Sequence, residues 1–283
     1  MPQELPSFDL VVATVGRVQE LGRFLDSLEA QEYPRVRVLV IDQNEDAQLE
    51  PILTGRGAEI VHLRSRPGLS RARNGALGHV TADIVAFPDD DCLYPPGSLG
   101  RLAERFSSDS LLDGLTGRAQ DASGTSAASW KTDPARLTDD NLWNRAISFT
   151  IFLRRTVVER VGTFDERLGL GSNGPWSSGE EIDYLIRAVR GDARIEYAPT
   201  FVVRHGVRID DARVGLRDGA SVGYLLRKHG YPLSSVARML VRPAGGIVVS
   251  LLHRDLAKGG YQLATFRGRL RGYRGAKRSK SSA

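Results

Sequence analysis

The stretch "DIVAFPDDDC", residues 83–92, joins an apolar run to three consecutive carboxylates, Asp89, Asp90 and Asp91. A short, continuous apolar run of this kind is typical of a strand buried on both faces of a parallel sheet. Three adjacent carboxylates repel one another, so the chain either leaves them fully solvated or neutralises them. Neutralisation requires a cation. The stretch therefore predicts a central strand with a metal site beyond its end.

Patterns of the same kind recur on the N-terminal side of this strand. Buried strands are expected at residues 8–15, 36–42 and 58–63, and they alternate with helical patterns. The helical stripes are Leu21, Phe24, Leu25 and Leu28, and later Leu99, Leu102 and Phe106. This alternation indicates an α/β fold with a doubly wound, mostly parallel sheet. Ligands of such sheets bind beyond the carboxyl ends of the strands, where Thr14, Asp42 and the aspartate triplet are expected to meet.

The second half of the chain has a different pattern. Residues 118–145 predict loops and short strands, and residues 146–155 predict a strand. A helix is expected from Glu180, then two short strands that close at His205, and then amphipathic helices. A Pro-Gly turn also precedes a helix in the first half, for which Ser70 is the expected N-cap. The chain is therefore expected to divide into two parts of one α/β domain, 1–117 and 118–206, followed by a helical extension at 207–266 and a basic tail at 267–283.

Composition limits the partners. Of 283 residues 41% are hydrophobic, which is enough for a full core. The formal charge is +5, but the segment from Arg267 onward holds seven basic residues and no acid. The basic character therefore belongs to the tail, which argues against nucleic acid as a partner of the folded body. A single Cys92 excludes an internal disulfide. Neither a secretory signal nor a membrane-spanning stretch is expected, so the predicted location is cytoplasmic.

The ordered set of motifs resembles glycosyltransferase family 2, the inverting enzymes of GT-A fold. The resemblance covers residues 8–206 and is carried by a strand ending in Asp42, "GLSRARNGAL", the aspartate triplet, "GEEIDYLIRAV" and "VRHG". It implies a nucleotide-sugar donor, an acceptor hydroxyl on a glycan or a lipid-linked glycan, and a divalent cation, Mg²⁺ or Mn²⁺. The implied role is cell-surface glycan or glycolipid synthesis.

The resemblance also assigns residues to the metal. Asp89 and Asp91 match the family's Asp-x-Asp pair, with Asp91 on the metal and Asp89 near both the metal and the donor ribose. His205 is expected to complete the ligand set, and the alternative is a structural histidine after an apolar strand. Asp90 is assigned to the donor side. The alternative is a solvated acidic turn. A P-loop is excluded because no G-x-x-x-x-G-K-[ST] occurs in the chain.

The catalytic base is expected at the start of the helix near residue 180. The family's Glu-Asp pair matches Glu180 and Glu181, so Glu181 is the expected base, with Asp183 as a substitute two residues on. The alternative is a helix N-terminus with acids that suit the helix dipole, and an Asp183–Arg187 ion pair on the helix surface.

The remaining assignments concern the two substrates. Donor contacts are expected from Thr14, Asp42, Gln43, Arg71, Arg73, Asn74, Asp89 and Asp90, and an acceptor contact from Trp176. Asp42 could instead cap its loop, the two arginines could lie on a solvated helix face, and Trp176 could pack within its own domain.

The tail and the activity each leave an alternative open. The C-terminal basic region predicts peripheral contact with the inner face of a membrane, or a disordered solubilising end. The alternatives to a transferase are a non-catalytic nucleotide-sugar or glycan-binding protein of this fold, and a sugar nucleotidyltransferase.

Overall fold

The computed structural model describes residues 5–127, 130–172, 174–206 and 211–275. By compactness the chain divides into two units, which we call the sheet unit and the helical unit. The sheet unit comprises Met1–Phe164 and Tyr184–Val207, and the helical unit comprises Asp165–Asp183 and Arg208–Ala283. The functional division expected at residues 117 and 206 stays a prediction.

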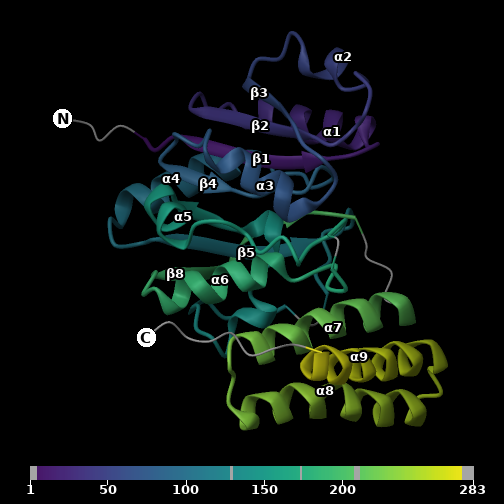
Figure 1. The fold of residues 1–283 in the computed structure, drawn as a ribbon. Coiled ribbons are helices and arrows are strands. Elements are labelled where there is room, and N and C mark those ends of the chain that lie inside the picture. The colour runs from purple at the N-terminus through teal and green to yellow at the C-terminus, as the bar shows by residue number, and fades with distance from the viewer. Residues whose placement is uncertain (1–4, 128–129, 173, 207–210, 276–283) are drawn as a thin grey trace. The chain divides into compact units, whose positions relative to one another are not determined.

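In the described residues, the sheet unit contains an eight-stranded mixed sheet with the strand order β3-β2-β1-β4-β7-β5-β8-β6 (Figure 1). The strands are β1 Phe8–Thr14, β2 Val36–Asp42, β3 Glu59–Arg64, β4 Ile84–Ala86, β5 Gly114–Gln120, β6 Ala135–Arg136, β7 Phe152–Arg154 and β8 Ile195–Arg204. Strands β1 to β4 are parallel, as is the pair β5 and β8, whereas β7 and β6 run antiparallel to their neighbours. The predicted α/β class is confirmed.

Helices connect the strands of this sheet. They are α1 Val18–Glu29, α2 Glu50–Leu53, α3 Leu69–Leu77, α4 Ser98–Ser108, α5 Arg155–Val161 and α6 Glu180–Arg190, with short 3₁₀ turns at Leu142–Asn144 and Ser148–Thr150. Helices α1 and α4 bury the apolar stripes predicted from the sequence. Those stripes join the apolar side chains of β1, β2 and β4 in one hydrophobic core, which fixes the ends of the strands where polar residues gather.

The prediction that Ser70 caps α3 is wrong. Helix α3 begins at Leu69, and its N-cap is Gly68. The φ angle of Gly68 is 131°, a backbone conformation that residues other than glycine rarely adopt. The Gly68 N–H donates to Gln43 Oε1 at 2.7 Å, and Ser70 is buried inside the first turn. The side chain of Gln43, which follows the end of β2, therefore anchors the entry to this helix.

Two strand predictions also change in detail. Of residues 146–155, only Phe152–Arg154 form a strand, because residues 148–150 close a 3₁₀ turn with Thr150 N–H donating to the Ile147 carbonyl at 2.9 Å. The two short strands expected before His205 are one strand, β8, whose pairing with β5 shifts register between Thr116 and Arg118. The 3₁₀ turn carries Ser148, and β8 ends at Arg204, directly before His205.

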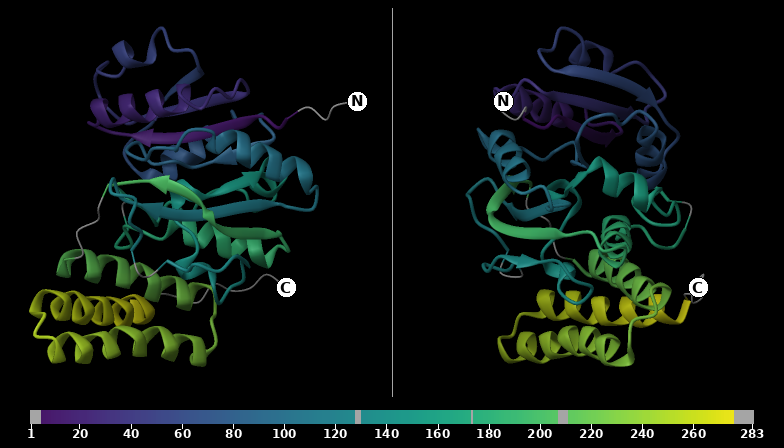
Figure 2. Two further views of the ribbon diagram at one scale, coloured as in Figure 1. Left: turned by 180° about the vertical axis from the view of Figure 1, so that it is seen from behind. Right: turned by 90° about the vertical axis from the view of Figure 1, so that its left-hand side faces the viewer.

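The helical unit holds the first residues of α6 and three long helices, α7 Ala212–Lys228, α8 Leu233–Leu252 and α9 Leu256–Gly275. Helix α9 lies beside both α7 and α8 (Figure 2). The predicted helical extension is confirmed. Residues 267–275 of the expected basic tail belong to α9, and residues 276–283 lie outside the described residues.

Glycines bring α7 and α9 into backbone contact. They recur every fourth residue, at Gly215, Gly219 and Gly223 on α7 and at Gly268 and Gly272 on α9. A Cβ atom added to Gly223 would lie 2.0 Å from the Arg269 carbonyl oxygen, and one added to Gly272 would lie 1.9 Å from that of Ala220. Small residues at this spacing allow two helix backbones to approach closely. The pairing of α7 with α9 therefore depends on the absence of side chains.

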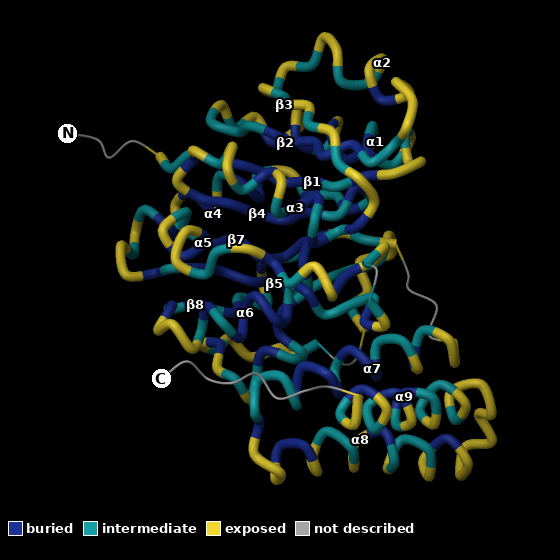
Figure 3. The backbone as a smooth tube through the Cα atoms, in the orientation of Figure 1, coloured by how far each residue is buried: buried dark blue, intermediate teal, exposed yellow. Residues whose placement is uncertain are grey.

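The expectation that no stretch could span a membrane is corrected. Within the described residues one helix, α8, is long and apolar enough to do so by length and composition, and 22% of that stretch is buried. Much of α8 and of the α8–α9 turn is exposed in Figure 3. Length and composition alone are weak evidence for a span, since buried core helices meet the same criterion.

Candidate active site

The predicted polar residues meet at the carboxyl ends of the parallel strands. Thr14, the last residue of β1, pairs in register with Asp42, the last residue of β2. A bridge between Ala13 and Asp89 continues the β1–β4 pairing to the first member of the aspartate triplet. The sheet topology therefore brings the triplet beside the end of β1, which is the usual ligand edge of such a sheet.

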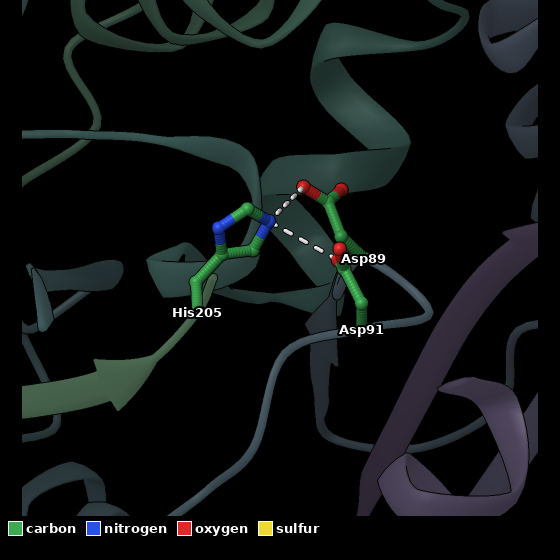
Figure 4. Close-up of side chains that lie close together, drawn as sticks. All are labelled: Asp89, Asp91 and His205. Carbon is green, nitrogen blue, oxygen red and sulfur yellow. Dashed lines mark ion pairs between the residues drawn. The ribbon is translucent and has the colours of Figure 1, made fainter. Parts of the chain in front are cut away.

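Asp89, Asp91 and His205 form a cluster, as Figure 4 shows. One ligand atom from each lies within 4.8 Å of the others, so a single ion could contact all three. His205 Nε2 lies 3.1 Å from Asp91 Oδ1 and 4.0 Å from Asp89 Oδ2. Ser148 donates to Asp89 Oδ1 at 3.1 Å, which orients that carboxylate. The structure thus assembles the three residues that the resemblance assigned to a metal.

The orientation of His205 suits a metal ligand. Its Nδ1 donates to the Gly206 carbonyl at 2.9 Å, which directs Nε2 toward the carboxylates. The imidazole stacks on Phe149 with ring centroids 4.6 Å apart and an angle of 1° between planes. Burial lowers the pKa of His205, but the adjacent Asp91 carboxylate outweighs it, and the net shift is upward. A positive charge is therefore favoured at Nε2, as a proton or as a bound cation.

The chemistry of this cluster fits a divalent cation. Carboxylate oxygens are the preferred ligands of Mg²⁺ and Mn²⁺, and neutral imidazole is a common metal ligand. Burial tends to raise the pKa of Asp91, but the His205 hydrogen bond and Arg17 outweigh it and lower the pKa to about 2. Asp91 is therefore ionised at neutral pH and ready to coordinate a cation.

Asp90 points away from this cluster. Its Oδ2 accepts a hydrogen bond from Thr14 Oγ1 at 2.7 Å, and its Oδ1 lies 3.1 Å from Arg17. Burial raises the pKa of Asp90 to about 6, despite the opposing effects of Thr14 and Arg17. Arg17 also donates to Asp91 at 2.5 Å. Asp90 therefore ties the triplet to the end of β1, and Arg17 links it to a metal-ligand candidate.

Arg17 and Ser148 were not identified from the sequence. Arg17 follows the end of β1 after a two-residue loop. A position just beyond a strand end is the sequence signal that could have identified it. Ser148 lies in a segment whose pattern predicted a strand, so its side chain had no assigned direction.

Arg73 lies deep in the sheet unit, so its interpretation as a solvated helix residue is wrong. Its side chain is fully buried, and its guanidinium lies 3.5 Å from Asp89 Oδ1. The guanidinium carbon lies 5.8 Å and 5.5 Å from the ring centroids of Phe87 and Phe164. Aromatic rings stabilise a desolvated cation in this position. Arg73 therefore supplies a fixed positive charge beside Asp89.

The neighbours of Arg73 on α3 make other contacts. Arg71 is partly exposed and donates to the Pro67 carbonyl at 3.3 Å. The Asn74 amide exchanges two hydrogen bonds with the backbone of Phe164, at 2.7 and 3.0 Å. This pairing ties α3 to Phe164, and the donor contacts expected of Arg71 and Asn74 stay predictions.

Asp42 occupies a saturated network at the end of β2. Its Oδ1 accepts from the Asn44 N–H and amide group at 2.9 and 2.7 Å, and its Oδ2 lies 2.9 Å from His62 Nε2 and 3.1 Å from Arg64. Burial would raise the pKa of Asp42, but these donors lower it. The geometry matches the alternative in which Asp42 caps its own loop. The nucleotide contact expected of Asp42, like that of Gln43, stays a prediction.

Asp183 is buried in the helical unit, so the predicted surface position is wrong. It forms an ion pair with Lys228 and lies 2.7 Å from His229 Nε2. Lys228 also pairs with Asp165 at 2.8 Å, and Asp165 pairs with Arg167 at 2.7 Å. Breaking such a buried network is costly because it leaves charges uncompensated. Asp183 therefore has a structural task, which weakens it as the alternative base.

The Glu180–Glu181 pair begins α6, as predicted. Glu180 is buried, whereas Glu181 is partly exposed. An accessible carboxylate is needed to accept a proton from a bound hydroxyl. Exposure therefore favours Glu181 over Glu180 and Asp183, and its role as base stays a prediction.

Trp176, the residue expected to contact the acceptor, is buried in the helical unit. Its ring stacks on Tyr224 with centroids 4.8 Å apart. This contact matches the alternative in which Trp176 packs within its own unit.

Comparison with solved structures defines the class of fold. The mannosyltransferase PcManGT from Pyrobaculum calidifontis, solved with GDP-Man and Mn²⁺, matches with a TM-score of 0.66 at 15% identity, over 95% of this chain and 88% of that one. S. aureus TarS with UDP-GlcNAc matches with a TM-score of 0.58 at 16% identity, over 94% and 91%. The sheet is therefore of GT-A type and is followed by the C-terminal helices α7 to α9.

Sequence comparison then gives the family. The profile named Glycosyl transferase family 2 matches residues 9–162, and the chain belongs to that family. The Pre-mycofactocin glycosyltransferase of Mycobacterium tuberculosis is 26% identical over 82% of this chain and 47% of its own length. The Succinoglycan biosynthesis protein ExoM of Rhizobium meliloti is 25% identical over 87% and 79%. This chain thus spans less than half of the mycobacterial relative.

Proposed function

We propose that this protein is a metal-dependent, inverting glycosyltransferase that moves a sugar from a nucleoside-diphosphate donor to an acceptor hydroxyl. The observation that carries the proposal is the convergence of Asp89, Asp91 and His205 at the ligand edge of the sheet. Family membership supports the reaction class, and the solved relative that holds GDP-Man and Mn²⁺ supports the kind of donor and cation.

In this proposal Asp89, Asp91 and His205 hold Mg²⁺ or Mn²⁺. The bound ion would act as a Lewis acid on the departing nucleoside diphosphate. Arg73 adds a fixed positive charge 3.5 Å from Asp89, which balances the carboxylates and favours an anionic ligand nearby. Asp90, held by Thr14, keeps the triplet in register with β1 and so positions its two neighbours.

Glu181 is the proposed base. It would accept the proton of the acceptor hydroxyl as that oxygen attacks the anomeric carbon from the face opposite the leaving group. Glutamate in place of the family's aspartate adds one methylene of reach and keeps the carboxylate chemistry. The proposed acceptor is a glycan or a lipid-linked glycan of the cell surface, consistent with a relative named for succinoglycan biosynthesis.

The test is product analysis with a panel of UDP-, dTDP- and GDP-sugars, with and without Mn²⁺. Donor binding is found first by thermal shift, since a ligand at 100 times its dissociation constant stabilises the fold by about 2.7 kcal/mol. Release of a nucleoside diphosphate that requires the metal is expected. Asp91→Ala should abolish it, whereas Glu104→Ala, which removes an exposed acid on α4, should not.

Other products would identify the alternatives. Release of pyrophosphate from a nucleoside triphosphate would indicate a nucleotidyltransferase. Donor binding without transfer or hydrolysis under any condition would indicate a binding protein of this fold.

A further inference from the structure

The helical unit exposes an apolar surface that the proposed reaction does not use. Five large apolar side chains within residues 241–252 of α8 and one in the first turn of α9 are each more than half exposed; we call them the α8 patch: Val241, Val248, Val249, Leu251, Leu252 and Leu256. Soluble surfaces rarely gather so many large apolar residues on one element, and such patches mark interaction sites.

Helix geometry puts three residues of the α8 patch on one face of the helix, which we call the strip. Val241, Gly245, Val248 and Leu252 follow one another at steps of four, three and four residues, which places them on one face of α8. The other face packs on α9. A Cβ atom added to Gly246 would lie 2.7 Å from the Gln262 side chain, and Arg269 donates to the Met239 carbonyl. The strip therefore points away from α9.

The charge around the strip has one sign. Residues 233–275 contain eight Arg and Lys residues and a single acid, Asp255. Arg238, Arg242, Arg254 and Lys258 are exposed beside the strip or at the α8–α9 turn. The Asp255 carboxylate accepts from the Lys258 N–H at 3.0 Å and thereby caps α9. An apolar strip flanked by cations suits an anionic lipid surface, with acyl chains under the strip and headgroups against the cations.

Other occupants fit less well. A second copy of this surface would bring equal positive charges together, which disfavours association. Residues 276–283, "AKRSKSSA", lack a large apolar side chain that could cover the strip. A bilayer-spanning arrangement would place Arg238 and Arg242 on the lipid-facing side of α8 and would expose the polar contacts with α9 to hydrocarbon.

We propose that α8 and the α8–α9 turn form a membrane-binding surface that lies in the interface of an anionic bilayer without crossing it. The inner leaflet of the cell membrane has the required negative surface potential, so the protein would act at that surface. The proposal is independent of the proposed transferase activity, because it predicts binding to lipid in the absence of any donor.

The test is sedimentation of the full chain with vesicles of phosphatidylcholine, with and without phosphatidylglycerol. Binding is expected only with the anionic lipid, and it should weaken as salt rises because salt screens headgroup attraction. The double variant Val248→Asp with Leu252→Asp should lower the partition coefficient at least about 10-fold, by losing apolar contact and adding negative charge. Leu111→Asp, which changes a 72% exposed leucine of the sheet unit, is the matched control and should bind normally.

The same preparations decide between the occupants. Circular dichroism must show that the double variant keeps its helices, and the milder pair Val248→Ser with Leu252→Ser should give a smaller loss of the same sign. Equal binding to neutral and anionic vesicles, or unchanged binding of both variant pairs, would overturn the proposal. So would retention in membranes after alkaline carbonate washing, which indicates a spanning helix, or lipid-free dimers that the Asp variant dissociates.

Discussion

The contact between α7 and α9 gives a sharp stability prediction through Gly272→Ala. The added Cβ would lie 1.9 Å from the Ala220 carbonyl oxygen and 2.8 Å from Tyr224 N, and both of these are backbone atoms. The two helices must therefore separate, because no side chain can rotate out of the way. Overpacking of this kind costs up to about 3 kcal/mol, from which the better helix propensity of alanine recovers about 1 kcal/mol. We expect a net loss of about 2 kcal/mol.

The matched control is Gly245→Ala on α8. This glycine is also inside a long helix, but its added Cβ would meet nothing within 4 Å. The substitution should stabilise by about 0.5–1 kcal/mol through helix propensity alone. The assay is urea unfolding followed by circular dichroism, with hydrogen exchange of α7 and α9 to locate the loss. If Gly272→Ala is as stable as Gly245→Ala, the close approach of the two backbones is wrong.

Three further predictions concern the charged groups. Asp91→Asn should keep the fold but weaken Mn²⁺ binding, measured by calorimetry, at least about 10-fold. Loss of a residue that merely orients a metal ligand already lowers metal affinity about 10- to 100-fold. Unchanged Mn²⁺ affinity would show that Asp91 is not a ligand. Glu181→Gln should retain donor affinity while the rate of transfer falls by about 10² to 10⁴. Asp183→Asn should instead lower the free energy of unfolding by about 3 kcal/mol, because it leaves Lys228 buried without its full partner. If the folded Asp183→Asn variant loses transfer and Glu181→Gln keeps it, Asp183 is the base. Burial tends to raise the pKa of Asp165, but hydrogen bonds from Arg167 and Lys228 outweigh it and lower this pKa below its ordinary 3.8. The stability that the ionised Asp165 contributes is therefore fully present above pH 3.8 and is lost as pH falls through the lowered pKa. Asp165→Asn should therefore destabilise clearly at pH 6 and less at pH 3 in urea unfolding, and a penalty independent of pH would contradict the ion pair.

The sheet and the placement of Asp89 and Asp91 could be predicted because local patterns determine them. Continuous apolar runs fix β1, β2 and β4 as buried parallel strands, and parallel strands end at a common edge. Asp89 and Asp91 could therefore be placed beside Thr14 without coordinates. His205 was assigned to the metal by resemblance, and the structure shows the physical basis: Leu93 and Arg204 exchange backbone hydrogen bonds at 2.8 and 2.9 Å, which brings the end of β8 to the triplet.

The burial of Arg73 could not be predicted from its own helix. Two arginines at positions 71 and 73 of α3 look alike in sequence, and both are compatible with a solvated face. What separates them is the pair of rings from Phe87 and Phe164, one of which lies more than 90 residues away. A tertiary contact therefore turns one arginine into a buried cation and leaves the other partly exposed.

The role of Asp183 also depends on contacts that the local sequence pattern cannot predict. Three acids in the first turn of α6 suit its dipole, and the i, i+4 spacing of Asp183 and Arg187 favours a surface ion pair. The partners of Asp183 that decide its role, Lys228 and His229, lie more than 40 residues later at the end of α7. Only folding of the helical unit brings them to the carboxylate and commits it to a buried network. Because the network occupies Asp183 and Glu180 is buried, Glu181 is the most accessible of the three acids, and its role as the base stays a prediction.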